Sequence, residues 1–355
     1  MALTHRENFL RNARFQGPEF MPCGVSISGA TWKELREDLE DVLVRHPVLF
    51  PGFKKGQRDF DAAGGRSAAG EYTDVWGCKW LNEIEGIVGV VVGHPLASWD
   101  ALDAYQPPDP DKCEHMDPCN WEQQIANLKK RKEQGGLTTG GMGHGFLFMR
   151  LTYLRGFENF MMDVATDDPH LPRLIGMVNG FNKALLNRYL SVGVDVMGFG
   201  EDLGTQTASI LGPKHFGKYM APAYHELFDP CRAAGTLVSL HSDGYIMDIA
   251  EDLIACGVDI INPQDLCNGI DRIERVFKGR VCIRLDIDRQ KIVPFGTPRD
   301  IHDLIEEEVR RLGSPKGGLE LLCGVYPPTP PENIDALIAA MEEFRTYWSD
   351  GRGGR

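Results

Sequence analysis

Five short apolar runs decide the fold, and the first of them reads Val194-Asp195-Val196-Met197-Gly198-Phe199. Each run has the length of a β-strand, and the other four cover residues 237–240, 258–261, 281–285 and 319–322. The stretches between and after them carry apolar residues at helical spacing, over residues 213–234, 246–256, 270–277, 298–312 and 331–348. Strands that alternate with crossover helices in this way are typical of a parallel sheet.

Glycines mark the ends of three of these predicted helices. Gly235, Gly257 and Gly279 each lie where a helix should stop, which suits the left-handed cap that glycine adopts at low cost. No Gly-x-Gly-x-x-Gly loop follows a strand, so the main sequence evidence for a dinucleotide-binding sheet is missing. We therefore predict an α/β fold, a (β/α)₈ TIM barrel.

The part of the chain before Gly141 has a different composition from the rest, with more glycine, proline and aromatic residues and weaker periodicity. We predict one barrel domain over residues 1–355, with an N-terminal extension over residues 1–85 and an inserted excursion over residues 105–141. Within the excursion, the pattern predicts a helix near residues 121–132.

Composition excludes several classes of function. A formal net charge of −13 without a long basic run argues against a nucleic-acid partner. No apolar stretch approaches the roughly 20 residues that a membrane span needs, and the first residues do not resemble a signal peptide. We expect a soluble, cytoplasmic protein whose nine scattered cysteines are mostly reduced, buried and inert.

Polar side chains follow each apolar run, at the position where a barrel carries its catalytic groups. From these we take as catalytic candidates Glu201, Asp202, Gln206, Asn262 and Gln264. Aspartates at strand-to-helix turns also cap the following helix by accepting backbone N–H bonds. That alternative stays open for Asp265, Asp286 and Asp288.

His241 and Cys323, which end two different strands, suggest a metal. Thiolate sulfur and imidazole nitrogen are ligands that zinc prefers, so the pair predicts a zinc site at the strand ends. A hydrogen-bonded core histidine is the alternative for His241. A competing metal cluster is the segment Cys113-Glu114-His115-Met116-Asp117-Pro118-Cys119, although no matching Cys or His pair follows at the usual spacing.

The sequence resembles the uroporphyrinogen decarboxylase superfamily, in particular its zinc-dependent methyltransferases that serve corrinoid proteins, such as the methylcobalamin:coenzyme M methyltransferases and O-demethylase methyltransferases. The resemblance covers most of the chain. It rests on residues 72–77, 154–159, 167–169, 201–206, 241–244, 257–264, 296–298, 323–324 and 328–333. An arginine-rich N-terminal segment like that of the porphyrinogen decarboxylases is not recognisable around Arg11 and Arg14.

The resemblance also implies a set of metal ligands. In these methyltransferases the zinc motif reads His-x-Cys with a distant second Cys, so His241 and Cys323 match, while Asp243 stands where the first thiolate is expected. A carboxylate is a harder ligand and leaves the metal more electrophilic, which suits an oxygen substrate. Glu201 resembles an acidic position of the family and is a candidate for the fourth ligand or a base.

From this resemblance we expect a methyltransferase. It would move a methyl group from a small methoxylated, possibly aromatic, compound to the cobalt of a separate corrinoid protein, with zinc as Lewis acid. Two alternatives remain: a metal-independent decarboxylase of a smaller or differently charged acid, and a catalytically silent barrel that binds a corrinoid protein.

Overall fold

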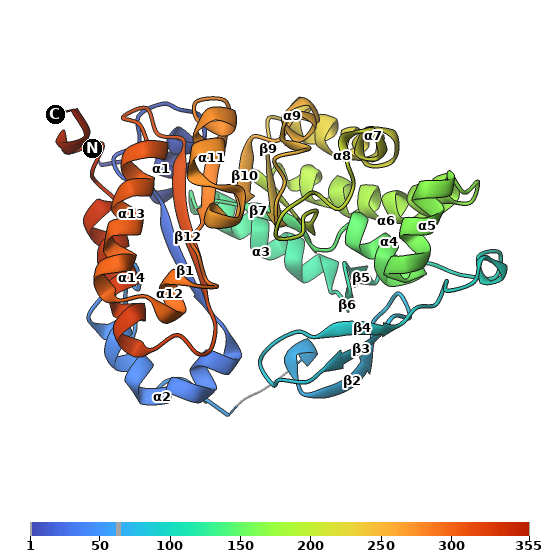
Figure 1. Cartoon of the computed structure of the whole chain (residues 1–355), viewed down its shortest axis with the longest axis horizontal. Coiled ribbons are helices and arrows are strands. Elements are labelled where there is room, and N and C mark those ends of the chain that lie inside the picture. The colour runs from blue at the N-terminus through green and yellow to red at the C-terminus, as the bar shows by residue number, and fades with distance from the viewer. Residues whose placement is uncertain (1, 62–64, 355) are drawn as a thin grey trace. The chain divides into compact units, whose positions relative to one another are not determined.

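The computed structural model describes residues 2–61 and 65–354, and the chain forms two compact units. Unit 1 comprises Met1–Gly70, Asn82–Gly89 and Pro263–Arg355. Unit 2 comprises Glu71–Leu81 and Val90–Asn262. Parallel strands with helices between them make up both units, so the chain has an α/β fold (Figure 1).

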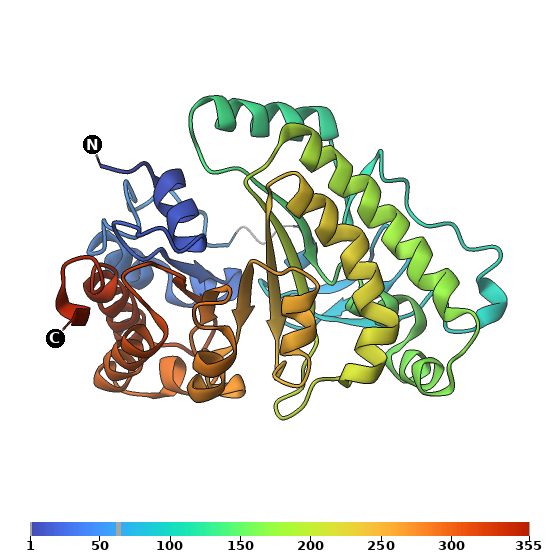
Figure 2. The ribbon, with the colours of Figure 1, turned by 90° about the horizontal axis from the view of Figure 1, so that it is seen from above.

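Unit 2 is built on strands that follow one another in the order β10-β9-β8-β7. Their bounds are β7 Thr139–His144, β8 Val196–Asp202, β9 Leu237–Asp243 and β10 Ile260–Pro263. β7, β8 and β9 pair in parallel. The long helices α6 (Leu171–Val192) and α8 (Ala221–Ala233) run side by side (Figure 2). α6 buries Leu171, Leu174, Val178 and Leu185 because they recur at helical spacing on one face.

Shorter elements complete unit 2. They are β5 Cys113–Glu114, β6 Asp117–Pro118, α3 Trp121–Glu133, α4 Phe148–Arg155, α5 Phe157–Thr166, α7 Pro213–His215, a π-helical turn Phe216–Met220, α9 Ala250–Ala255 and a 3₁₀ turn Trp99–Ala101. A small sheet has the order β2-β3-β4, with β2 Gly70–Thr73, β3 Lys79–Asn82 and β4 Val90–Gly93.

Unit 1 carries three parallel strands in the order β1-β12-β11, namely β1 Cys23–Ile27, β12 Leu319–Val325 and β11 Cys282–Asp286. Its helices are α1 His5–Ala13, α2 Gly29–Val44, α10 Asp265–Asn268, α11 Ile270–Phe277, α12 Ile292–Phe295, α13 Pro298–Leu312 and α14 Pro331–Phe344, with 3₁₀ turns Gly65–Ser67 and Arg352–Gly354. α13 begins with a capping box between Thr297 and Asp300, and it lies beside α14 (Figure 1).

The structure confirms the five predicted strands and the five predicted helices, with shifts of a few residues at their ends. The helix predicted near residues 121–132 is α3. Gly235, Gly257 and Gly279 have φ values of +74°, +98° and +75°, as expected for left-handed caps. All nine cysteines are free, and six of them are buried.

Among the parallel strands, β1 and β7 were not predicted. β7 contains three glycines in its six residues, so it lacks the apolar run that marks the other strands. β1 lies within the predicted N-terminal extension and pairs with β12, so the extension supplies part of the parallel sheet. Among the described residues, every helix is too short or too polar to span a lipid bilayer.

Candidate active site

Three neighbouring strand ends of unit 2 bring polar side chains together. The pairing of β7, β8 and β9 places His144, Gly200 and His241 in register. Residues aligned across a parallel sheet project to the same face, so two imidazoles flank a position without a side chain. Their ring centroids lie 5.8 Å apart. Asp202, two residues after Gly200, projects to the same face, and its Oδ1 lies 2.8 Å from His144 Nε2.

A buried amide orients the second imidazole. His241 Nδ1 lies 2.8 Å from Asn262 Oδ1, and this oxygen can only accept, so Nδ1 carries the ring proton. The other nitrogen, Nε2, holds a lone pair when the ring is neutral, and it lies 3.3 Å from Asp243 Oδ1. An electron-rich nitrogen therefore faces a carboxylate oxygen, an arrangement that a cation between them would stabilise.

His144 and Asp202 form the more exposed half of the cluster, with side-chain exposures of 47% and 32%. Burial alone would lower the pKa of His144, but the hydrogen bond and charge of Asp202 outweigh this effect and raise the pKa above its usual value. The Asp202 carboxylate therefore favours a positive charge at this imidazole.

The donor set fits a divalent metal. His144, Asp202 and His241 can each offer one ligand atom, and these atoms lie within 4.8 Å of one another. Two imidazole nitrogens and one carboxylate oxygen are ligands of zinc and of ferrous iron in proteins. Among the residues that the structure describes, the other such group is His302, Asp303 and Glu306 on α13.

Close backbone contact fixes the loops that carry these residues. A Cβ atom on Gly244 would lie 2.1 Å from the carbonyl oxygen of Gly204, so the loops after β8 and β9 touch where neither residue has a side chain. Gly244 also has a φ of +79°. This contact adjoins Asp243 and lies two residues after Asp202, so it restricts where both carboxylates can lie.

Glu201 takes a different role from its neighbour Asp202. Its carboxylate is completely buried and accepts hydrogen bonds from the backbone N–H groups of Leu147 (2.8 Å), Phe148 (2.7 Å) and Met149 (3.0 Å). These N–H groups lie at the start of α4, where the helix itself provides no hydrogen-bond acceptor for them. Burial raises the pKa of Glu201 to about 7, against the opposite effect of the three hydrogen bonds. In this arrangement the side chain caps α4.

The middle of α4 is held by a buried ion pair. Arg150 Nη1 donates to Asp74 Oδ2 at 2.9 Å, and both side chains are almost completely buried. Asp74 also accepts from the backbone N–H groups of Trp76 and Cys78 and from Trp80 Nε1. A buried charge pair is costly to break on one side, because the remaining charge is left without its partner. The segment around Asp74 thus acts as a structural anchor.

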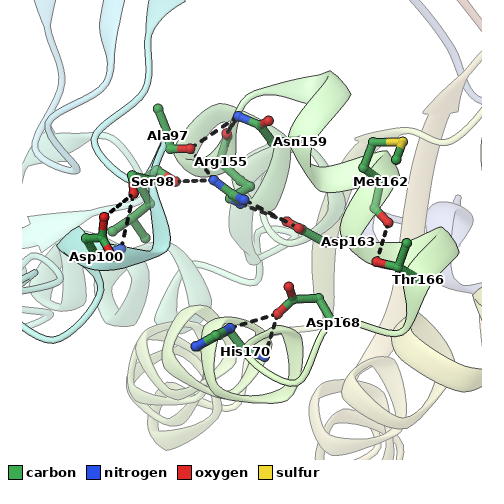
Figure 3. Close-up of polar contacts among 11 residues, drawn as sticks. Ala97, Ser98, Asp100, Arg155, Asn159, Met162, Asp163, Thr166, Asp168 and His170 are labelled. Carbon is green, nitrogen blue, oxygen red and sulfur yellow. Dashed lines mark hydrogen bonds and ion pairs between the residues drawn. The ribbon is translucent and has the colours of Figure 1, made fainter.

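Arg155 holds the other end of α4 (Figure 3). Its Nε donates to Asp163 Oδ2 of α5 at 2.7 Å, and Nη1 donates to the carbonyl oxygens of Leu96 and Ala97. Asn159 adds a bond to the Ala97 carbonyl oxygen at 3.3 Å. These bonds tie α4, α5 and the segment after His94 to one guanidinium group.

An apolar pocket of about 320 Å³ lies against this anchored helix. Its lining consists of Val91, His94, Phe148, Met149, Thr152, Tyr153, Phe157, Asp202 and Ile210. The pocket therefore meets the polar cluster at Asp202. His94 Nδ1 donates to the Tyr153 carbonyl oxygen at 2.8 Å, which leaves Nε2 as a hydrogen-bond acceptor in the lining. Small-molecule sites usually combine such an apolar wall with few polar groups.

The predicted site residues thus have different surroundings. The structure brings together His241, Asp243, Asp202 and Asn262 within unit 2. Gln206 lies exposed in the loop after β8, and Gln264 lies buried in unit 1. Cys323, also in unit 1, is completely buried, and its Sγ lies 3.8 Å from the carbonyl oxygens of Ile287 and Gly324. Burial and nearby acidic groups hold the pKa of the Cys323 thiol well above its usual value.

His144 was missed because its strand was missed. A sequence signal for His144 does exist. A histidine ends the segment Thr139–His144, just as polar residues end the next strand, which was predicted. Gly143 has a φ of +70°, and the pairing with β8 is irregular between Gly141 and His144. An irregularity at a strand end commonly redirects the next side chain.

The competing cysteine cluster forms a small hairpin. Cys113 pairs with Pro118 and Glu114 with Asp117, and the Glu114 carboxylate accepts from Gln124 Nε2 at 2.8 Å and from the Tyr189 hydroxyl. Cys119 donates to Gln124 Oε1 at 2.8 Å. Within the described residues, no group of three metal-binding side chains includes this segment.

Comparison with known proteins places this architecture in a family. Residues 60–344 match the family model described as uroporphyrinogen decarboxylase (URO-D). Two curated relatives from Methanosarcina barkeri, both methylcobamide:CoM methyltransferase MtaA, are 24% identical over 169 residues and 23% identical over 164 residues. The matched part is 45% of this chain and 45% of each relative, so the chain spans about half the length of the curated relatives it matches.

A solved structure supports the fold over nearly the whole chain. It is a methyltransferase from Methanosarcina mazei, 16% identical, with a TM-score of 0.60, and the match covers 96% of this chain and 98% of that one. The predicted resemblance is therefore confirmed. Since the family model matches well over half of its residues, the chain belongs to the uroporphyrinogen decarboxylase family.

Proposed function

We propose that this protein transfers a methyl group from a small methoxylated compound, an aromatic ether in the first place, to the cobalt of a separate corrinoid protein. The proposal rests on one observation: the apolar pocket beside α4 and the polar cluster meet at Asp202. A methoxyarene has the matching form, with an apolar ring for the pocket and one ether oxygen for the cluster. The methyl transfer named for the curated relatives supports the same reaction type.

The chain's residues have separable tasks in this reaction. Phe148, Tyr153 and Phe157 would pack against the ring and exclude water. Zinc bound at the polar end, where His241 lies, would act as a Lewis acid on the ether oxygen. The methyl carbon–oxygen bond would break with its electrons on oxygen, and the methyl carbon would bond to the reduced cobalt of the corrinoid protein. Water would then supply the proton that turns the departing oxygen into a hydroxyl group.

The remaining predictions belong to the same proposal. Asp243, Cys323 and Glu201 stay predicted metal ligands beside His241, and Gln206, Asn262 and Gln264 stay predicted catalytic residues. We also propose that the parallel strands close into a (β/α)₈ barrel forming one domain, and that the protein works in the cytoplasm. The alternation of strands and helices in both units supports the barrel.

A reconstituted assay tests the function. Purified protein is mixed with a reduced corrinoid protein and a panel of methoxyphenols, and methylcobalamin and the demethylated phenol are measured together. We expect both products in equal amounts, and we expect Phe157→Ala to raise KM more than it lowers kcat because Phe157 is an exposed pocket residue. If no donor yields either product, the proposal is rejected.

The same assay separates the alternatives. If the protein decarboxylates a small acid and keeps this activity after its metal ions are chelated, the metal-independent lyase is favoured. Tight binding of a corrinoid protein without turnover of any donor would favour a binding subunit.

A further inference from the structure

We infer that a divalent first-row metal ion binds to this protein through His144, Asp202 and His241. These residues end three neighbouring strands of unit 2. The inference deepens the proposed function, since it names a ligand set for the same site. It differs from the set predicted from the sequence, because it adds His144 and Asp202 and needs neither Cys323 nor Glu201.

The spacing of the donor atoms supports this set. Bonds from zinc to imidazole nitrogen or carboxylate oxygen are about 2.0–2.2 Å long, so two ligand atoms on one ion lie at most about 4.4 Å apart. The three donors lie within 4.8 Å of one another, so small side-chain adjustments bring them onto one ion. Their strands pair directly, which fixes the spacing of the three Cα atoms before any metal arrives.

The tautomer of His241 provides an independent observation. Asn262 accepts the Nδ1 proton, so Nε2 is the nitrogen that faces Asp243 Oδ1, at 3.3 Å. A proton on Nε2 or a metal ion beside it would stabilise this pair. Orientation of a ligand imidazole through its second nitrogen is the usual arrangement at protein metal sites. Asn262 therefore acts as a positioning residue for His241, and Asp243 adds negative charge beside the ion.

Gly200 provides the room for this ion. It lies in register between His144 and His241, and a Cβ atom on it would lie 3.1 Å from His144 Cα and 3.2 Å from the Gly143 carbonyl oxygen. A side chain at this position would push against β7 and fill the space between the two rings. The absence of a side chain keeps both imidazoles able to approach a shared ligand.

The surroundings of the other predicted ligands differ. Glu201 is fully buried, and its two oxygens accept from three backbone N–H groups of α4. Cys323 is a completely buried thiol of unit 1. Neither side chain is needed for a site of two imidazoles and one carboxylate, which matches the common arrangement that leaves positions open for a substrate.

Metal analysis tests the ligand set without any methyl transfer. Protein purified without chelator is analysed for zinc and iron, and the apo-protein is titrated with Zn²⁺ and with Fe²⁺ under anaerobic conditions. We expect about one site per chain, and we expect His144→Ala, Asp202→Ala and His241→Ala each to weaken binding by more than about tenfold. Asn262→Ala should weaken it less, and Asn262→Asp, which keeps an acceptor for Nδ1, should restore it.

One matched control, His170→Ala, should keep metal binding, because it removes an exposed imidazole that is hydrogen-bonded to Asp168 elsewhere in unit 2. Cys323→Ala, which removes the buried thiol, decides between the two ligand sets: it should keep the metal if His144, Asp202 and His241 hold it, and lose the metal if Cys323 is a ligand. Unchanged melting temperatures would show that each variant is folded. The inference is overturned if wild-type protein binds neither metal, if Cys323→Ala loses the metal, or if His144→Ala binds it as tightly as wild type.

A spectroscopic readout covers the case in which a variant does not fold. Wild-type protein loaded with Co²⁺ should show d–d absorption without the thiolate-to-cobalt charge-transfer band, and that band would contradict the inference. The outcomes are separable from the proposed function. A metal bound by this set without methyl transfer rejects only the reaction, whereas methyl transfer with a thiolate-bound metal rejects only the ligand set.

Discussion

The strand ends of the two units use the same residue types in opposite ways. In unit 1, Asp288 follows β11, and its carboxylate accepts from the backbone N–H groups of Gln290, Lys291 and Ile292. Asp265 follows β10 and accepts from the N–H groups of Leu266 and Asp288. In unit 2, Asp202 and Asp243 end β8 and β9, and each lies beside an imidazole.

The difference separates structural from chemical carboxylates. A carboxylate whose oxygens are filled by backbone N–H groups stabilises a loop and has little capacity left for a ligand. A carboxylate that faces imidazole nitrogen at a pocket keeps that capacity. Glu201 and Asp202 show both roles within one strand, since Glu201 caps α4 and Asp202 lines the pocket.

The largest effect on stability is expected in unit 1. Asp288→Ala should lower the free energy of unfolding by about 2 kcal/mol, because three backbone N–H groups lose a charged acceptor whose own side chain is buried. Urea denaturation measures the change. Asp288→Asn keeps one acceptor oxygen and should lose less. A loss below about 0.5 kcal/mol for Asp288→Ala would contradict the structural role.

An intermediate effect concerns pH. Burial raises the pKa of Asp265 to about 7, and burial together with the charge of Asp265 holds the pKa of the fully buried Glu308 well above its usual value. The folded chain thus binds more protons than the unfolded chain. Stability should therefore fall as pH rises from about 4 through about 7, by at most about 1.4 kcal/mol per pH unit for each proton.

Glu308→Gln tests this pH dependence. The amide mimics the neutral acid, so the variant should keep wild-type stability near pH 5 and lose less of it near pH 8. Thermal unfolding followed by circular dichroism at several pH values gives the comparison. Parallel curves for wild type and variant would show that the buried acid does not titrate in this range.

The smallest effect on stability is expected in unit 2. Asp202→Ala should cost less than about 1 kcal/mol, since the pair with His144 is partly exposed to solvent. The same urea experiment measures it beside Asp288→Ala. If Asp202→Ala proved as destabilising as Asp288→Ala, the contrast between the two sets of strand ends would disappear.

Much of the fold could be predicted from the sequence because apolar runs and helical spacing record local burial. β8 to β12 and their helices follow that pattern, and the capping glycines indicated where three of the helices end. β7 does not, since its three glycines pack against neighbouring residues instead of presenting apolar side chains. A Cβ atom on Gly140, for example, would lie 2.6 Å from the Tyr189 ring.

The site was harder to predict than the fold. His241, Asp202 and Asn262 could be found because each lies within two residues of the end of a recognisable strand. Whether Glu201 or Asp202 faces the pocket depends on how the backbone of α4 approaches β8, and sequence spacing does not encode that approach. Segments 72–77 and 154–159, which carry part of the family resemblance, contain the anchors Asp74 and Arg155.

The rate of methyl transfer to a reduced corrinoid protein tests the central claim most directly. The claim is that the cluster at the strand ends of unit 2 is catalytic. With a methoxyphenol donor, His241→Ala and Asp202→Asn should each slow methylcobalamin formation by at least about 100-fold, with melting temperatures close to wild type and with full activity in His170→Ala. Rates within twofold of wild type in the folded His241 and Asp202 variants would contradict the account.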